Sequence, residues 1–481
     1  MSLNADDYVR ADAVQLAEWV RRKEVSPAEI VECAIARIDA LDPVLNTVAH
    51  RLDDMARQTV AHGVPAEGML VGVPLLVKDT GVTVAGAPMT SGSALFRGNI
   101  SIADSTLITR YREAGLVLLG KTNTPELGLS FTTEPLAQGA THNPWNPDYS
   151  PGGSSGGAAA AVAAGIVPIA HASDGAGSIR LPSAHCGVFG FKPSRMRVPM
   201  GPVIGEALAG MSAPHCITRS VRDSAAMLDA CAWPEPGDPY AVKASERPYM
   251  QEVARDPRRL RIGVSTRSPL GGAVHADCRD AVARAAALCA ELGHEVEEAE
   301  MAYDAVAVKD AWRVIVGIAA LTGVQAQEKK IGLRDRFSML EPVNAAWMRW
   351  ASGLSAVDYA LALNTIRAAG RSCGRSFEMY DVFLTPAAAT PPPRLGELAC
   401  HDEDAEAFYD RFCAHGPFTA VHNATGCPGM SIPMGLQGQG LPVGVHFGAA
   451  LGNDGVLMAL AGQIERAAPW HYTCIGWKGV S

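Results

Sequence analysis

Apolar residues recur at helical spacing through the first sixty residues. The first stripe consists of Val14, Leu16, Ala17, Trp19 and Val20, and a second runs from Ile30 to Ile38. Between them, Ser26-Pro27-Ala28-Glu29 has the form of a capping box with proline at the first helical position. The pattern therefore predicts two helices, the second of which begins at Pro27.

The period changes at Val71, where a continuous apolar run begins. Residues 71–77 predict a buried strand, and Lys78 stands at its carboxyl end. The following pattern predicts a helix from Asp104-Ser105 to Gly115, a strand over 116–119, an Ala-rich helix over 156–164 and a strand over 166–172. Because helices and strands alternate, we expect an α/β fold with a largely parallel sheet covered by helices.

The second half of the chain continues this alternation and adds a helical segment. We expect a helix over 220–232, a strand over 260–265, a helix over 277–292 and further strands at 382–384 and 444–447. The segment from about 300 to 375 is helical throughout and carries Trp312, Trp347, Trp350 and Tyr359. We find no linker and no repeat, so we expect a single domain over 1–481, with the 300–375 segment as its most individual part.

Composition and charge exclude several classes of partner. Hydrophobic residues make up 48% of the 481 residues and the net charge is −9, with no block of Lys or Arg. A nucleic-acid partner or an anionic membrane surface needs a clustered basic face, so we expect neither. The polar, acidic start of the chain does not resemble a signal peptide, and the apolar stretch 156–172 is short and interrupted by Pro168, so we expect no membrane span.

The 11 cysteines include no Cys-x-x-Cys pair and lie mostly in apolar or helical contexts. This usage is typical of reduced core thiols in a cytoplasmic protein. His471 and Cys474 have a metal-like spacing, but no second pair accompanies them, so we expect no metal site there.

Two short motifs match functional patterns without the structural context that those functions need. Gly115 to Thr122 fits the phosphate-binding P-loop, but its four middle residues form the predicted strand itself and Pro125 follows shortly. Gly152 to Gly156 fits a nucleophile elbow around Ser154, but the preceding segment contains three prolines and is not a strand. We therefore expect neither an ATP site nor an ordinary elbow nucleophile.

A third motif, Asp174-Gly175-Ala176-Gly177-Ser178-Ile179-Arg180, follows a predicted strand. Small residues before a serine allow consecutive backbone N–H groups to face one point, where they can bind an oxyanion. Ser178 could attack a carbonyl held there. His171 and His185 each lie seven residues from Ser178, about 10 Å along a helix, which disfavours a local Ser–His pair. A distant His, or Lys78 at its strand end, remains as the base.

Several motifs together resemble the amidase signature family. They are Gly72 to Asp79 with Lys78, Gly120 to Glu126, Gly152 to Gly157 with Ser154, Asp174 to Arg180 with Ser178, Gly187 to Pro193, and Asn423 to Pro433 followed by Gly440 to Gly444. Ser154 and Ser178 stand 24 residues apart, as the two serines of that family do. The resemblance covers nearly the whole chain, with its core at about 71–195.

The resemblance implies a large mixed, mostly parallel sheet with helices on both faces, and a Ser–cis-Ser–Lys triad. Ser178 would be the nucleophile, and Ser154, after a cis peptide bond, would connect it to Lys78. Backbone N–H groups of Gly175, Ala176, Gly177 and Ser178 would form the oxyanion hole. Lys78 must then be neutral, which requires that burial lower its pKa from about 10.4 by roughly 3 units.

The sequence departs from the family pattern at Ala176, where glycine is usual. If this residue needs a positive φ, the alanine adds about 1 kcal/mol of strain. Within the family, the stretches at 121–126, 133–135, 143–146 and 174–178 most resemble 6-aminohexanoate-cyclic-dimer hydrolases. We expect the 300–375 segment to line part of the substrate pocket, and its tryptophans to contribute either to that pocket or to the core.

The implied activity is hydrolysis of a carboxamide C–N bond in a small linear or cyclic amide, through an acyl-enzyme and without a metal or organic cofactor. One alternative is the glutaminase subunit of a tRNA-dependent amidotransferase, which would need a partner chain. Another is a non-catalytic scaffold with the same fold, and a third is an esterase using the same site. The resemblance also leaves a homodimer open.

Overall fold

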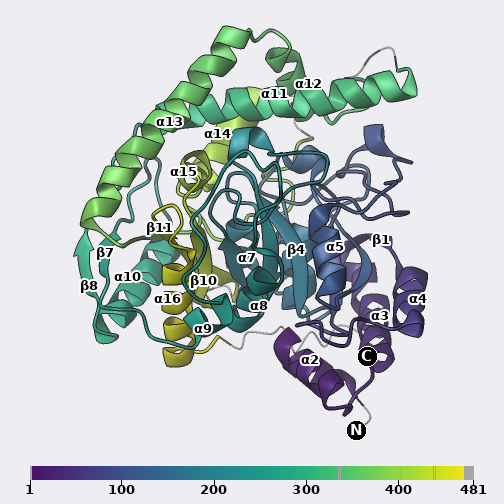
Figure 1. The fold of residues 1–481 in the computed structure, drawn as a ribbon. Helices are drawn as coiled ribbons and strands as arrows, with labels where there is room; N and C mark the ends of the chain where they lie inside the picture. The colour runs from purple at the N-terminus through teal and green to yellow at the C-terminus, as the bar shows by residue number, and fades with distance from the viewer. Residues whose placement is uncertain are drawn as a thin grey trace.

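The computed structural model describes residues 3–333, 335, 337–401, 404–436, 438 and 440–470. His471 and Cys474 lie outside them. An 11-stranded sheet runs through the described residues, in the order β1-β3-β2-β4-β6-β5-β10-β11-β9-β7-β8 (Figure 1). Along the chain the strands are β1 (Val48–Arg51), β2 (Pro74–Lys78), β3 (Val117–Thr122), β4 (Ile169–Asp174), β5 (Phe189–Lys192), β6 (Ala213–Thr218), β7 (Arg261–Val264), β8 (Glu295–Glu298), β9 (Val382–Pro386), β10 (Gly429–Leu436) and β11 (Pro442–Ala449).

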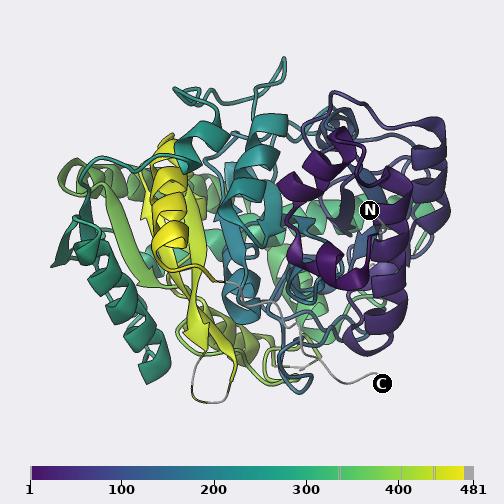
Figure 2. The same cartoon turned by 90° about the horizontal axis from the view of Figure 1, so that it is seen from below.

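The helices of the first half are α1 (Ala5–Arg10), α2 (Ala13–Arg21), α3 (Pro27–Leu45), α4 (Asp53–His62), α5 (Thr106–Glu113), α6 (Gly156–Ala163), α7 (Arg180–Cys186) and α8 (Val221–Cys231). Of these eight helices, α2, α3, α5, α6 and α8 confirm the sequence pattern, whereas α1, α4 and α7 were not predicted. The predicted capping box is confirmed, because the Ser26 side chain accepts from the Glu29 N–H while the Glu29 carboxylate accepts from the Ser26 N–H. The N-terminal helices α1 to α4, drawn in purple, gather at one side of the molecule when it is seen from below (Figure 2).

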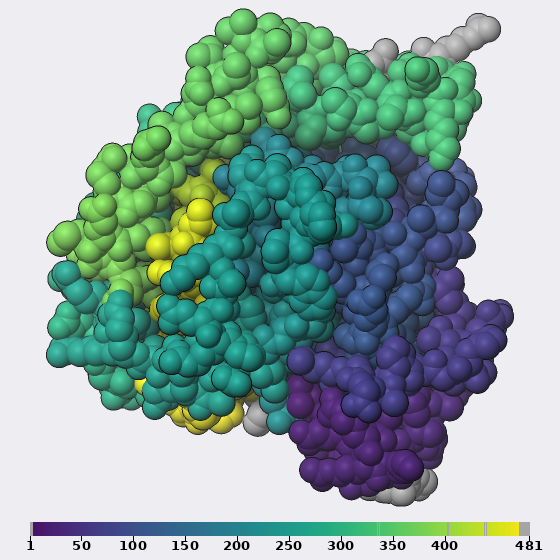
Figure 3. Space-filling view, viewed as in Figure 1, coloured from purple at the N-terminus to yellow at the C-terminus, as the bar shows by residue number. Residues whose placement is uncertain are grey.

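The remaining helices include the segment that the sequence marked as individual. They are α9 (Tyr249–Val253), α10 (Ala276–Glu291), α11 (Ala305–Ile331), α12 (Pro342–Ala351), α13 (Ala356–Met379), α14 (Ala405–His415), α15 (Ala420–Thr425) and α16 (Asp454–Ala467). Helices α11, α12 and α13 form a ridge across the top of the molecule, above α7 and β4 (Figures 1 and 3). The prediction of a helical 300–375 segment is confirmed.

The sheet is mixed, but the expectation that it would be mostly parallel is wrong. Four of the ten strand pairings in the described residues are parallel, namely those of β2 with β3 and β4 and of β7 with β8 and β9. The other six are antiparallel. The argument from alternation fails in the centre of the sheet, because neighbours such as β10 and β11 are joined by a hairpin, which requires antiparallel pairing.

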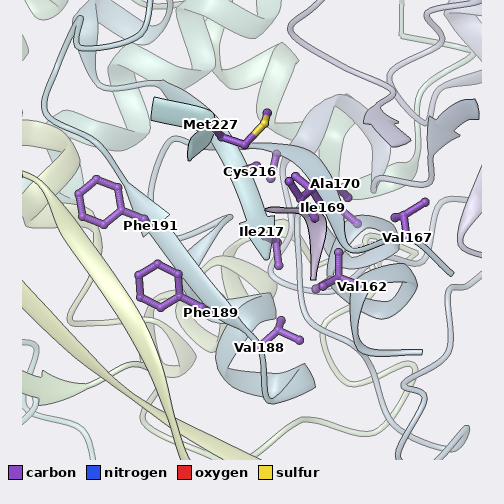
Figure 4. Close-up of a cluster of buried hydrophobic side chains, with 14 of the residues drawn as sticks. Val162, Val167, Ile169, Ala170, Val188, Phe189, Phe191, Cys216, Ile217 and Met227 are labelled. Atoms are coloured by element: carbon purple, nitrogen blue, oxygen red, sulfur yellow. The ribbon is translucent and has the colours of Figure 1, made fainter. Parts of the chain in front are cut away.

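Helices cover both faces of the sheet. On β11, a Cβ on Gly444 would lie 2.8 Å from Ala184 of α7 and one on Gly448 would meet His422 of α15, so this face of the strand lies close to both helices. The alternate residues Val445 and Phe447 belong to a core cluster with residues of α10 and α16 on the opposite face. Figure 4 shows the centre of this core, where Ile169 of β4, Phe189 of β5 and Ile217 of β6 lie together.

None of the helices in the described residues is long and apolar enough to cross a membrane. Within the same residues, no group of three or more His, Cys, Asp or Glu side chains is arranged to hold a metal ion.

Candidate active site

Lys78 is the last residue of β2, a strand buried along its whole length. Its side chain is 1% exposed, and its Nζ donates to Ser154 Oγ at 2.8 Å. Weaker contacts reach the Ser173 hydroxyl at 3.3 Å and the Ser173 carbonyl at 3.5 Å. Burial lowers the pKa of Lys78 to about 7, although the negative charge of Asp174 opposes this shift. Close to half of the Lys78 side chains are therefore neutral at pH 7 and able to accept a proton.

Ser154 lies in a glycine-rich loop that other backbone segments approach closely. The Gly153–Ser154 peptide bond is cis, and a Cβ on Gly153 would lie 2.5 Å from the Thr132 carbonyl oxygen. The Ser154 carbonyl accepts from Thr124 Oγ1 at 2.9 Å. These contacts fix the loop from two sides, so the Ser154 hydroxyl has a defined position at the end of the Lys78 side chain.

Ser178 ends a loop that follows β4. It is 7% exposed and faces the same cavity as Lys78 and Ser154. The Ser155 N–H donates to the Ser178 carbonyl at 3.3 Å, which holds the two serine loops side by side. The hydrogen bonds found among the described residues include none made by the Ser178 hydroxyl or by the backbone N–H groups of residues 175–178. The four N–H groups of the predicted oxyanion hole are therefore not engaged by any described residue.

A buried ion pair closes the Ser178 loop. Arg180 Nε and Nη2 donate to the two carboxylate oxygens of Asp174 at 2.9 and 2.8 Å, and both side chains are fully buried. The Ile179 N–H also donates to Asp174, at 3.0 Å. Burial alone would raise the pKa of Asp174, but the Arg180 guanidinium holds it below its ordinary value, so the carboxylate stays charged.

Two residues far away in the sequence fix this loop as well. Asn423 donates to the Asp174 carbonyl at 2.8 Å and accepts from Arg180 Nη2 at 2.6 Å, while the Thr419 hydroxyl donates to the Ala176 carbonyl. The sequence analysis did not assign either role. The motif beginning at Asn423 was the available signal, but it does not indicate which groups its side chains contact.

The concern about strain at Ala176 is not supported, because Ala176 is not among the residues with positive φ. The positive φ of the loop falls on Gly177, at +147°, where a Cβ would also lie 2.5 Å from Thr419 Oγ1. Glycine is thus required at 177 and not at 176. The methyl group of Ala176 is instead part of an apolar cluster.

The histidines near Ser178 in sequence make their contacts elsewhere. His171 Nδ1 accepts from the Lys78 backbone N–H at 3.3 Å, and no hydrogen bond between Ser178 and any histidine is found among the described residues. Burial lowers the pKa of both His171 and His185 well below its ordinary value. The P-loop interpretation is also excluded, since Gly120 and Lys121 lie within β3 and the buried Lys121 Nζ donates to the Val82 carbonyl.

A cavity of about 450 Å³ connects these residues to the helical ridge. The residues of α11 that line it are Trp312, Val316, Ala319, Ala320, Thr322 and Gly323, so the 300–375 segment borders this cavity. Trp312 lines the cavity and Trp347 is buried in the core behind it, whereas Trp350 is exposed and takes neither of the two expected roles. Among the described lining residues, the charged side chains are Lys78 and Glu206.

Comparison with known proteins identifies the family. The model of the family described as Amidase matches residues 29–458. The 6-aminohexanoate-cyclic-dimer hydrolase of Paenarthrobacter ureafaciens is 37% identical over 477 residues, covering 95% of each chain. A solved structure of 6-aminohexanoate cyclic dimer hydrolase with its substrate has a TM-score of 0.90 at 36% identity, covering 96% of this chain and 98% of the other.

A bacterial aryl acylamidase of the amidase signature family is also similar in structure. Its TM-score is 0.88 at 30% identity, and the match covers 97% of this chain and 98% of that one. The family model and these relatives match nearly the full length of this chain, and this chain covers nearly the full length of the relatives. The chain therefore belongs to the amidase family and is an amidase-signature amidohydrolase.

Proposed function

We propose that the protein hydrolyses a carboxamide bond with Ser178 as nucleophile, Ser154 as proton bridge and Lys78 as base. The observation that carries this proposal is the 2.8 Å hydrogen bond from the buried Lys78 Nζ to Ser154 Oγ, in a cavity that Ser178 also lines. The lowered pKa of Lys78 supports the role of a base near neutral pH.

In the first half-reaction, the Ser178 oxygen bonds to the carbonyl carbon while its proton passes to Ser154 and the Ser154 proton passes to Lys78. The negative charge on the carbonyl oxygen is stabilised by the free N–H groups of residues 175–178. The C–N bond then breaks, and the proton held by Lys78 returns through Ser154 to the leaving amine. Water cleaves the resulting ester by the same relay, releasing the acid and restoring Ser178.

The cavity favours a small amide without a carboxylate group. Its lining is mostly apolar, and its described residues include no arginine and no lysine other than Lys78. Two relatives are named for cyclic dimers of 6-aminohexanoate and for aryl acylamides, both of which fit this description. We therefore propose linear or cyclic small amides as substrates. An ester would use the same groups and differ only in what leaves.

The glutaminase alternative is less well supported. Glutamine carries an α-carboxylate, which would need a cationic partner in the pocket, whereas Glu206 would repel it. The scaffold alternative would have to explain why the hydrogen-bonded Lys78–Ser154 pair and Ser178 are all retained at the cavity. A homodimer remains a prediction.

Labelling with a small fluorophosphonate, followed by intact-mass spectrometry, tests the proposal. We expect one adduct on the wild type and none on Ser178→Ala. Ser212→Ala is the matched control, because Ser212 lines the same cavity without a proposed role, and it should be labelled like the wild type. An adduct that persists in Ser178→Ala, or a wild type that is not labelled, would overturn the assignment.

A further inference from the structure

A second, smaller cavity lies next to the substrate cavity and shares a wall with it. Its volume is about 40 Å³, and its own lining is mostly apolar, with Val308, Pro417 and Val421 beside the charged Lys309. Four residues line both cavities: Phe131, Ala176, Trp312 and Phe412. We call these four residues, which border both spaces, the partition.

The partition is a packed stack of rings. Phe131 and Phe412 stack with centroids 3.9 Å apart and planes 11° from parallel, and Trp312 lies 5.6 Å from Phe412 at 24°. The three rings and the Ala176 methyl group belong to one apolar cluster. A Cβ on Gly416 would lie 2.4 Å from the Phe131 ring, so the backbone supports the stack from behind. Such close packing does not yield easily to a longer ligand.

Trp312 differs from the other rings because it is bonded to the Ser178 loop. Its indole Nε1–H donates to the Gly175 carbonyl at 3.0 Å. The neighbouring Trp347 has its ring centroid 5.8 Å from that of Trp312, yet its Nε1 finds no hydrogen-bond partner in the described part of the chain and it lines neither cavity. Only one of these two tryptophans therefore touches both the substrate space and the backbone of the predicted oxyanion hole.

We propose that Trp312 determines specificity in this enzyme and also positions the Ser178 loop. By closing the substrate cavity against the smaller one, its ring limits the length of the apolar chain that an amide substrate can carry. Through its N–H group it fixes the Gly175 carbonyl, and with it the N–H groups that follow in the loop. This inference rests on the proposed function of Ser178.

Two substitutions separate the two roles. Trp312→Leu opens the partition, and Trp312→Phe keeps a ring but removes the N–H donor. The substrates are two series of anilides and alkyl amides, in which an unbranched chain grows by one methylene at a time on the acyl or the amine side. Trp347→Leu and Trp347→Phe are the matched controls. Circular dichroism checks each fold, and Trp312→Met replaces Trp312→Leu if the latter does not fold.

For Trp312→Leu we expect the preferred chain to lengthen in one of the series, with kcat/KM for the longer amides rising about tenfold relative to the short ones. For Trp312→Phe we expect an unchanged chain preference and a kcat lowered roughly five- to tenfold at nearly constant KM, as the loss of one hydrogen bond predicts. Both Trp347 variants should keep the wild-type chain preference and kcat.

Fluorophosphonate labelling of the wild type distinguishes a failure of the proposed function from a failure of the role of Trp312. If the wild type is labelled but Trp312→Leu prefers the same chain length as the wild type, the specificity role alone is overturned. Equal effects of the Trp312 and Trp347 substitutions would overturn it too, since they would indicate a general loosening of the apolar cluster. A kcat for Trp312→Phe equal to the wild-type value would overturn the positioning role. A wild type that is not labelled would remove the proposed function and this inference with it.

Discussion

The pH dependence of the reaction follows from the burial of Lys78. An ordinary lysine with a pKa near 10.5 is neutral in only about one molecule in three thousand at pH 7. With its pKa lowered to about 7, Lys78 is neutral in about half. The site thus gains about a thousand-fold in the population of the competent base. Because the proposed mechanism requires the neutral form, activity should rise with pH through about 7 and then level off.

The assay is kcat/KM for a small anilide between pH 5 and 9.5, which reports groups that titrate in the free enzyme. The rate of fluorophosphonate labelling, measured over the same range, should show the same ascending limb. A profile that is flat from pH 5 to 9, or whose ascending limb lies near pH 10, would refute the argument that burial makes Lys78 the base.

The lowered pKa of Lys78 should also make the stability of the folded protein depend on pH, and Lys78→Met removes this dependence. Between about pH 7 and 10.5 the unfolded chain binds a proton that the folded protein has lost, so the folded wild type becomes more stable as pH rises. We expect Lys78→Met to be inactive but more stable than the wild type at pH 6, with a difference in the free energy of unfolding that shrinks by about 4 kcal/mol by pH 10. Urea unfolding measures this, and the exposed Lys243→Met is the control. A constant difference would contradict the lowered pKa.

Three further substitutions test the loop around Ser178. Ala176→Gly should lower the free energy of unfolding by about 1–2 kcal/mol without raising activity, because Ala176 is unstrained and its methyl is buried; a gain in activity would restore the idea of strain. Thr419→Val removes the hydroxyl bound to the Ala176 carbonyl, and should lower kcat about five- to tenfold with little change in KM. Asp174→Asn leaves Arg180 buried without its counter-charge and should cost about 3–5 kcal/mol in urea unfolding, against less than about 1 kcal/mol for Asp39→Asn at the exposed Arg51.

Local features of the fold could be predicted because they leave a local pattern. A fully buried strand requires a continuous apolar run, so β2 and the position of Lys78 at its end could be predicted from residues 71–78. The capping box at Ser26 could also be predicted, since both of its partners lie within four residues of the sequence. The direction of strand pairing could not be predicted, because it depends on connections such as the β10–β11 hairpin that hydrophobic spacing does not encode.

The candidate site shows the same difference between residues that a local motif locates and residues that only the fold brings together. The family motifs located Lys78, Ser154 and Ser178, but the residues that hold them come from elsewhere: Asn423 binds Asp174 across 249 positions of the chain. Trp312 and Trp347 illustrate the limit most directly. Both are aromatic residues at buried positions of helices, and nothing in their spacing tells which one faces a cavity and which one faces the core.

Asp174 connects the geometry of the Ser178 loop to the proton affinity of Lys78. Its charge raises the pKa of Lys78 against the larger effect of burial, while its hydrogen bonds with Arg180 and the Ile179 N–H shape the loop. Replacing Asp174 with asparagine removes a negative charge and exposes Lys78 to the unpaired charge of Arg180; both changes disfavour the ammonium form. The ascending limb of the pH profile should therefore move to lower pH in Asp174→Asn even as kcat falls. A limb that stays in place would mean that Asp174 acts only through the shape of the loop.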